Sequence, residues 1–183
     1  MSAGTEAESV TVVSVSYHSA DVLQHMLSSL PPKVATIVVD NGGTDPVAGV
    51  AQRFSARLVR LETNAGFGRG CNAGAALSTS EFIFFVNPDA IVVEGAIEAL
   101  VSFFDAEPTA AAANPRILDG RGKPRFRGRS LLSQPAASVG NRAPAVATEV
   151  PTLLGSALFC RRTAFEAVGG FDPEIFLYHE DDD

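Results

Sequence analysis

An apolar run in this chain leads directly into groups that can bind a cation. Residues 82–86 (FIFFV) are followed by Asn87, Pro88 and Asp89. A carboxylate beside an amide offers the hard oxygen ligands that Mg²⁺ or Mn²⁺ prefers, and a bound diphosphate needs such a cation to offset its charge. Asp89 is therefore a candidate metal ligand. The alternative is that Asp89 only belongs to a turn or caps a helix.

A second carboxylate, Asp40, follows the apolar residues 34–39. Right-handed crossovers return consecutive parallel strands in the same direction, so we expect Asp40 and Asp89 at the same edge of one sheet. Ligands of open α/β sheets bind at that edge, outside the carboxyl ends of the strands. There Asp40 can accept a hydrogen bond from a ring N–H or a ribose hydroxyl. A turn residue is again the alternative.

Residues 64–74 (NAGFGRGCNAG) are rich in glycine and open a predicted helix. Glycines at such a position let backbone N–H groups approach phosphate oxygens. Within this stretch, residues 68–73 match the GxGxxA fingerprint of dinucleotide-binding oxidoreductases, with Asp89 as the ribose-binding acid. That alternative leaves Asp40 without a role, and the predicted turn at residues 17–19 has no glycine.

A third acidic group, residues 180–183 (EDDD), follows an apolar segment that begins at Phe171. A run of acids is usually a solvated surface. The apolar lead-in favours a different position, in which these acids emerge from the core into a cleft. A carboxylate among crowded like charges is suited to act as a general base.

Elements that could position these groups alternate along the first hundred residues. The predicted strands are residues 10–16, 34–39, 57–61, 82–86, 110–114 and 153–160, and the predicted helices are residues 20–30, 47–54, 71–77, 94–105 and 163–168. Strict alternation predicts βαβ units and a mostly parallel central sheet with helices on both faces. The later part, from residue 110, predicts an irregular and partly antiparallel back half.

The back half contains a basic segment, residues 116–129, with six Lys or Arg and one acid around a predicted hairpin turn at 119–122. It could contact a lipid-diphosphate acceptor or be a solvated hairpin. Residues 130–148 are rich in Ala, Pro and Ser and predict a loop.

Composition narrows the class of protein. With 46% hydrophobic and 19% charged residues, the 183-residue chain is long enough for one core, and its net charge of −7 argues against nucleic acid as a partner. Cys71 and Cys160 predict reduced thiols in a cytoplasmic protein. Residues 1–9 predict a flexible tail, residues 10–183 a single domain, and the abrupt acidic end predicts that the sequence is part of a longer protein.

Taken together, the motifs resemble those of family-2 inverting glycosyltransferases of the GT-A fold, in particular the rhamnosyltransferase-like branch. The resemblance covers residues 12–183. It is carried by VSYH at 15–18, VVDNGGTD at 38–45, NxGFGxGxNxG at 64–74, NPD at 87–89, GSALF at 155–159, GGFD at 169–172 and YHEDDD at 178–183.

This resemblance implies a role for individual residues. Tyr17 and Asp40 would hold the nucleotide base, Asp89 would bind the divalent cation, and Asp181 would be the catalytic general base. The full set that it assigns to nucleotide-sugar binding is Ser16, Tyr17, Asp40, Asn64, Gly66, Phe67, Asn72, Asn87, Asp89 and Gly155. Because Asn87 stands where many relatives have the first acid of Asp-x-Asp, we expect weaker metal affinity.

The activity that the resemblance implies is Mg²⁺- or Mn²⁺-dependent transfer from a nucleoside-diphosphate sugar, dTDP-rhamnose or similar, with inversion. The acceptor would be a hydroxyl of a cell-envelope glycan or of a lipid-linked glycan, reached at the inner face of the cell membrane. If the protein ended at Asp183, we would expect weak activity or none. A non-catalytic module that binds sugar nucleotides or glycans is the alternative from another class.

Overall fold

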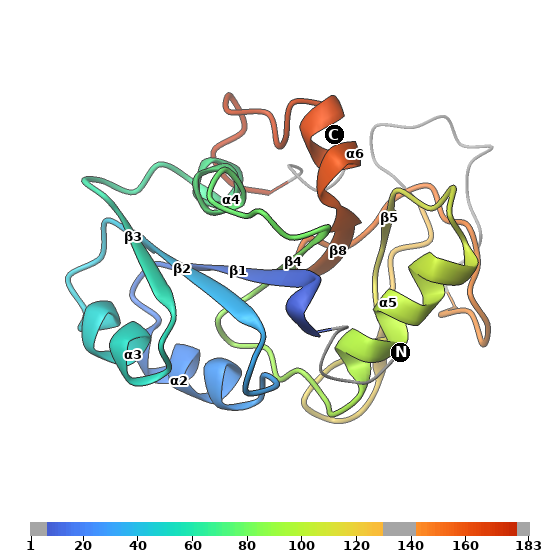
Figure 1. Cartoon of the computed structure of the whole chain (residues 1–183), viewed down its shortest axis with the longest axis horizontal. Coiled ribbons are helices and arrows are strands. Elements are labelled where there is room, and N and C mark those ends of the chain that lie inside the picture. The colour runs from blue at the N-terminus through green and yellow to red at the C-terminus, as the bar shows by residue number, and fades with distance from the viewer. Residues whose placement is uncertain (1–6, 130–141, 179–183) are drawn as a thin grey trace.

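The structure is a computed structural model that describes residues 7–129 and 142–178. Within this part of the chain, a six-stranded sheet has the order β3-β2-β1-β4-β8-β5 (Figure 1). The strands are β1 (Val10–Ser16), β2 (Ala35–Asn41), β3 (Arg57–Leu61), β4 (Phe82–Val86), β5 (Ala112–Ala113) and β8 (Ala157–Arg161). Strands β1 to β4 are parallel, and β8 pairs antiparallel with both β4 and β5. This arrangement confirms the predicted fold class.

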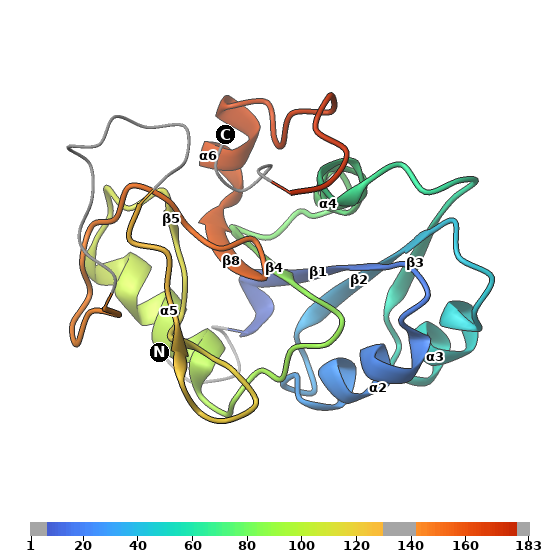
Figure 2. The ribbon, with the colours of Figure 1, turned by 180° about the vertical axis from the view of Figure 1, so that it is seen from behind.

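Helices cover both faces of the sheet, as predicted. They are α2 (Ala20–Ser28), α3 (Val47–Arg53), α4 (Phe67–Ala75), α5 (Ala96–Ala106) and α6 (Arg162–Ala167). Figures 1 and 2 show α2 and α3 on one side of the sheet and α4 and α6 on the other. Side chains of α5 join the core on the α2 and α3 side. Among the described residues, no helix is long and apolar enough to span a bilayer.

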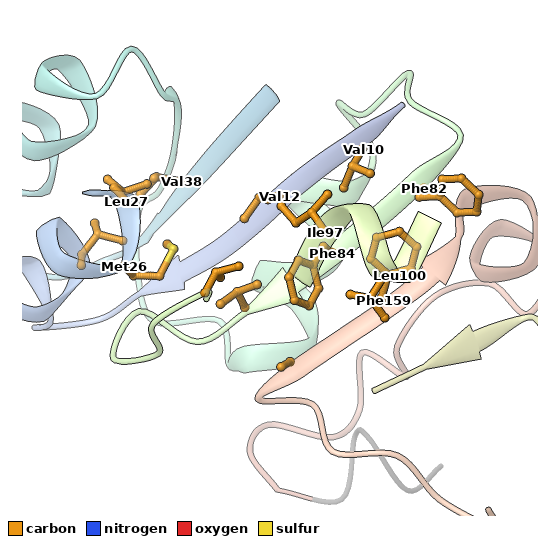
Figure 3. Packing of buried hydrophobic residues seen from close by; sticks show 14 of the residues in the cluster. Val10, Val12, Met26, Leu27, Val38, Phe82, Phe84, Ile97, Leu100 and Phe159 are labelled. Carbon is orange, nitrogen blue, oxygen red and sulfur yellow. The ribbon is translucent and has the colours of Figure 1, made fainter. Parts of the chain in front are cut away.

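Strand β4 is buried on both faces along its whole length, which confirms the prediction from its apolar sequence. Phe82 and Phe84 point to one face, where the ring of Phe159 lies 5.2 and 5.7 Å from theirs. Figure 3 shows these rings beside Ile97 and Leu100 of α5. Ile83 and Phe85 join the core of the opposite face, under α4. Alternation of side chains along a strand produces this division.

Strand β2 runs further than predicted. It includes Asp40 and Asn41, which were expected in a turn, and Asp40 pairs with Ser16 of β1 and Arg60 of β3. Parallel neighbours on both sides provide ladder partners for the backbone, so polar side chains do not end the strand. As a result Asp40 and Asn41 are held by the sheet itself.

Helix α4 begins at Phe67, inside the stretch that was predicted as a glycine-rich loop. Gly66 before it has a φ of 93°, a conformation that favours glycine. A Cβ at Gly74 would collide with the Val13 side chain of β1. Glycine therefore lets this helix pack closely against the sheet, and this packing outweighs the low helix propensity of glycine.

The back half contains a second, two-stranded sheet of β6 (Ile117–Leu118) and β7 (Pro124–Arg125). The hairpin turn predicted at 119–122 is confirmed. Backbone N–H groups of Lys123 and Arg121 donate to Asp119 Oδ1 (3.0 and 2.9 Å), and they lower the pKa of this carboxyl. The predicted strands at 110–114 and 153–160 are shorter than expected, and most of the predicted loop at 130–148 lies outside the described residues.

Candidate active site

A cavity of about 480 Å³ opens at the carboxyl edge of β1, β2 and β4. Segments that are far apart in the sequence supply its walls. The lining residues are Val15, Tyr17, Ser19, Val22, Asn41, Asn64, Gly66, Phe67, Asn87, Pro88, Asp89, Phe176 and Leu177. The structure thus brings together, of the predicted nucleotide-sugar residues, Tyr17, Asn64, Gly66, Phe67, Asn87 and Asp89.

Asn87 and Asp89 are placed by the end of β4. The Asn87 N–H donates to the Ser156 carbonyl oxygen (3.0 Å), which extends the pairing with the β8 side by one residue. Pro88 then has no N–H to continue it. Asp89 is exposed, and in the described part of the chain it is the one carboxylate that lines the cavity.

The number of potential metal ligands near Asp89 determines how a cation could be bound here. Nowhere in residues 7–129 and 142–178 do three or more His, Cys, Asp or Glu side chains group to hold a metal ion. Mg²⁺ sites commonly use one or two carboxylates together with water and substrate phosphates. The single carboxylate and the Asn87 amide fit a cation shared with a diphosphate, and they do not fit a cation held by protein side chains alone.

Asp40 and Ser16 do not line the cavity, but Ser16 contacts a residue that does. Asp40 is only 9% exposed, and its Oδ1 accepts a hydrogen bond from the Gly43 N–H (3.3 Å). Its Oδ2 lies 3.9 Å from Nε of the largely exposed Arg60, a pair that contributes little energy. Ser16 Oγ lies 2.8 Å from Oγ of Ser19, which lines the cavity.

Asn41 was missed by the sequence analysis, although its side chain is buried at the cavity wall. Its Nδ2 donates to Asn64 Oδ1 (3.0 Å) and to the Gly66 carbonyl oxygen (3.2 Å). Its Oδ1 accepts from the Ala65 N–H (3.0 Å). Asn41 therefore fixes the turn at residues 64–66, which precedes α4. The available signal was an amide directly after Asp40, at the end of an apolar run.

Three consecutive N–H groups, from the turn before α4 to its first residue, have partners within the protein. Ala65 donates to Asn41 Oδ1, Gly66 to Asn64 Oδ1 (3.0 Å), and Phe67 to the Phe176 carbonyl oxygen (3.1 Å). These three N–H groups therefore already donate within the protein in this arrangement. Glycine also serves packing here, since a Cβ at Gly70 would collide with Val15.

The remaining predicted residues lie elsewhere. Both amide atoms of Asn72 bond to the backbone of Phe171, and Asn72 is not among the cavity residues. Gly155 is buried in the segment before β8, away from the cavity lining. Asp181, the predicted general base, lies outside the described residues.

Cys71 and Cys160 are buried and do not form a disulfide. Burial raises the pKa of Cys160 to about 12. The Cys160 thiol is thus protonated at neutral pH, which makes it a poor nucleophile and a poor metal ligand.

A family model described as "Glycosyl transferase family 2" matches residues 11–169 of this chain. The chain belongs to glycosyl transferase family 2. The match spans most of the sequence, including every described residue of the cavity except Phe176 and Leu177. The predicted family is therefore confirmed, and the dinucleotide-binding alternative has no support.

A named relative agrees with this assignment, and solved structures agree with the fold. An N-acetylglucosaminyl-diphospho-decaprenol L-rhamnosyltransferase of Mycobacterium tuberculosis is 30% identical over 207 residues, which cover 94% of this chain and 67% of that protein. The crystal structure of S. aureus TarS 1-349 in complex with UDP has a TM-score of 0.71 at 19% identity, covering 94% of this chain and 52% of TarS 1-349.

A mannosyltransferase from Pyrobaculum calidifontis, PcManGT, in complex with GDP-Man and Mn²⁺, has a TM-score of 0.67 at 21% identity. The similarity covers 94% of this chain and 49% of that one. The chain thus spans about half the length of these two solved proteins. Their likeness shows the fold, which is the predicted GT-A fold.

Proposed function

We propose that this chain forms the donor-binding part of a metal-dependent inverting glycosyltransferase. The observation that supports the proposal is the cavity at the carboxyl edge of β1, β2 and β4, which is lined by six of the ten predicted donor residues, from separate segments. The donor would be a nucleoside-diphosphate sugar, and the rhamnosyltransferase relative favours dTDP-rhamnose or a similar sugar nucleotide. The acceptor would be a hydroxyl of a cell-envelope or lipid-linked glycan.

Different residues of the cavity would contact different parts of the donor. Tyr17 is 47% exposed at the cavity and offers its ring to the nucleotide base. Asp40 would act indirectly. Its Oδ1 accepts a hydrogen bond from the Gly43 N–H, and Gly43 lies close to the backbone of His18, the residue after Tyr17. Asn64, Gly66 and Phe67 form the wall that would face the sugar diphosphate.

Asp89 and Asn87 would hold the divalent cation together with the donor diphosphate. When bound, the cation supplies positive charge that stabilises the departing nucleoside diphosphate. Asp89 is exposed at the cavity, so its carboxylate could bind a cation that arrives together with the donor diphosphate. A single carboxylate also explains why we expect the nucleotide and the cation to bind together.

Asp181 is proposed as the general base of the transfer. It would accept the proton of the acceptor hydroxyl while that oxygen forms a bond to the anomeric carbon of the donor sugar. The bond from the anomeric carbon to the diphosphate oxygen breaks on the opposite face, so the configuration inverts. The reaction would take place at the inner face of the cell membrane if the acceptor is lipid-linked.

A transfer assay with the full-length protein tests this proposal. Radiolabelled nucleotide sugars, dTDP-rhamnose first, would be incubated with Mn²⁺ and a lipid extract as the source of acceptor. We expect label in the lipid fraction, and Asp181→Asn should keep donor binding but lose transfer by about a thousandfold or more. Retained turnover in Asp181→Asn would contradict its role. Donor binding without transfer would favour the non-catalytic module.

A further inference from the structure

A segment near the end of the described chain, residues 171–178, crosses the first turns of α4, and we call it the strap. It follows α6 and lies beside α4 in both views of the ribbon (Figures 1 and 2). Its backbone is bound by three residues of α4. The Phe67 N–H donates to the Phe176 carbonyl (3.1 Å), Arg69 Nε to the Pro173 carbonyl (2.7 Å) and Asn72 Nδ2 to the Phe171 carbonyl (2.8 Å), while the Phe171 N–H donates to Asn72 Oδ1 (3.0 Å).

The two ends of the strap are held differently. Phe171 is buried, and its ring lies 5.4 and 5.3 Å from the rings of Phe85 and Phe165. At the other end, a Cβ on Gly66 would overlap the Phe176 carbonyl oxygen, so glycine is required for the close approach. The start of the strap is thus held by ring packing in the core and by both amide atoms of Asn72, and its later residues depend on hydrogen bonds from Phe67 and Arg69.

The later residues of the strap form part of the candidate donor cavity. Phe176 and Leu177 line it, although their exposed fractions are 56% and 50%. Because about half of each side chain is exposed, side-chain packing contributes little to their position, which depends mainly on the hydrogen bonds of the strap backbone. Hydrogen bonds between α4 and the strap therefore determine where this wall of the cavity lies.

We propose that Arg69 and Asn72 are positioning residues that hold the strap across α4, so that Phe176 and Leu177 form one wall of the donor site. The role of that wall rests on the proposed function. Asn72 acts through the Phe171 backbone, to which both of its amide atoms are bound. By linkage, a nucleotide that contacts the strap must also stabilise it.

Amide hydrogen exchange of the strap tests the anchoring without any ligand. Removing bonds of ordinary net strength should speed exchange of residues 171–177 about two- to tenfold in Arg69→Ala and in Asn72→Ala. The matched control is Arg116→Ala, because Arg116 is also exposed and also donates to a proline carbonyl, that of Pro144 (2.8 Å). It should leave strap exchange unchanged. Unchanged exchange in Arg69→Ala, which is exposed and should fold, would overturn the anchoring.

Calorimetry with dTDP, UDP and GDP in the presence of Mn²⁺ tests the role of the wall. A nucleotide that binds the wild type should bind Arg69→Ala and Asn72→Ala about two- to tenfold more weakly, and Arg116→Ala equally well. Arg69→Lys retains a donor and should recover part of the affinity. A faster-exchanging strap with unchanged affinity would overturn the role of the wall. If none of the nucleotides binds the wild type, the proposed donor site fails, and the exchange comparison alone decides the anchoring.

Discussion

Asn41 is the buried polar side chain that joins the end of β2 to the turn before α4. Replacing it with Ala would leave Asn64 Oδ1, the Gly66 carbonyl and the Ala65 N–H without this partner. Buried polar groups that lose a partner cost about 1–3 kcal/mol. We therefore expect Asn41→Ala to lower the free energy of unfolding by about that amount in a urea titration, and to weaken nucleotide binding about tenfold.

Thr11→Val provides the control for Asn41→Ala. Thr11 is buried in β1, and its Oγ1 donates to Ser80 Oγ (2.8 Å) at the opposite edge of the sheet from the cavity. This substitution removes a buried hydrogen bond and nearly keeps the shape of the side chain. It should reduce stability while nucleotide affinity stays the same. Equal loss of affinity in both variants would mean that Asn41 has no particular role at the cavity.

The position of a single residue could be predicted from the sequence where its neighbours in the chain determine it. Asp89 could be placed at a strand end because an apolar run and a proline mark that end. The role of Asn41 could not be predicted, because its partners lie 23, 24 and 25 residues later in a turn whose position depends on packing. Asn72 could not be placed for the same reason, since Phe171 is 99 residues away.

Helix α4 depends on close contact with β1, which gives a prediction at the level of elements. A Cβ at Gly74 would collide with Val13, so Gly74→Ala must push the helix away from the sheet. Overpacking of this kind costs about 1–3 kcal/mol. Because α4 also carries the turn at 64–66 and the strap, nucleotide affinity should fall with stability. Urea titration and calorimetry measure the two effects.

Gly49→Ala is the matched control for Gly74→Ala. Gly49 also lies within a helix, α3, but a Cβ there would meet no atom within 4 Å. With open space, alanine should stabilise the protein by about 0.5–1 kcal/mol because it restricts the unfolded chain and favours the helix. If Gly74→Ala were also neutral or stabilising, the close packing of α4 would be wrong.

Some bounds of strands and helices could be predicted from the sequence, and others depend on packing between elements. The bounds of β1, β3 and β4 were predicted correctly. Strands β1 and β4 are mainly apolar or β-branched, and β3 (RLVRL) alternates charged and apolar residues over most of its length. The end of β2 was not predicted correctly, since β1 and β3 on its two sides continue the backbone hydrogen bonding through the polar residues at its end. The start of α4 was missed because glycine disfavours helices locally, whereas packing against β1 requires small residues here.

At the scale of the whole molecule, the topology brings the site together. Parallel strands β1, β2 and β4 end at one edge, so the groups after them meet in one cavity although they are separated in the sequence. This convergence was predictable from the alternation of strands and helices. The contribution of residues 176 and 177 was not, because the chain returns to the cavity only after the antiparallel strand β8 and helix α6.

The arrangement leads to one central claim, that Asp89 binds a cation jointly with a nucleoside diphosphate in this cavity. Calorimetric titration of dTDP, UDP and GDP, each with and without Mn²⁺, tests it on the wild type and on Asp89→Ala. We predict that Mn²⁺ strengthens binding of at least one nucleotide about tenfold or more in the wild type, and that Asp89→Ala loses this gain but keeps the metal-independent affinity. An equal gain from Mn²⁺ in Asp89→Ala, or no binding of any of these nucleotides to the wild type, would contradict the claim.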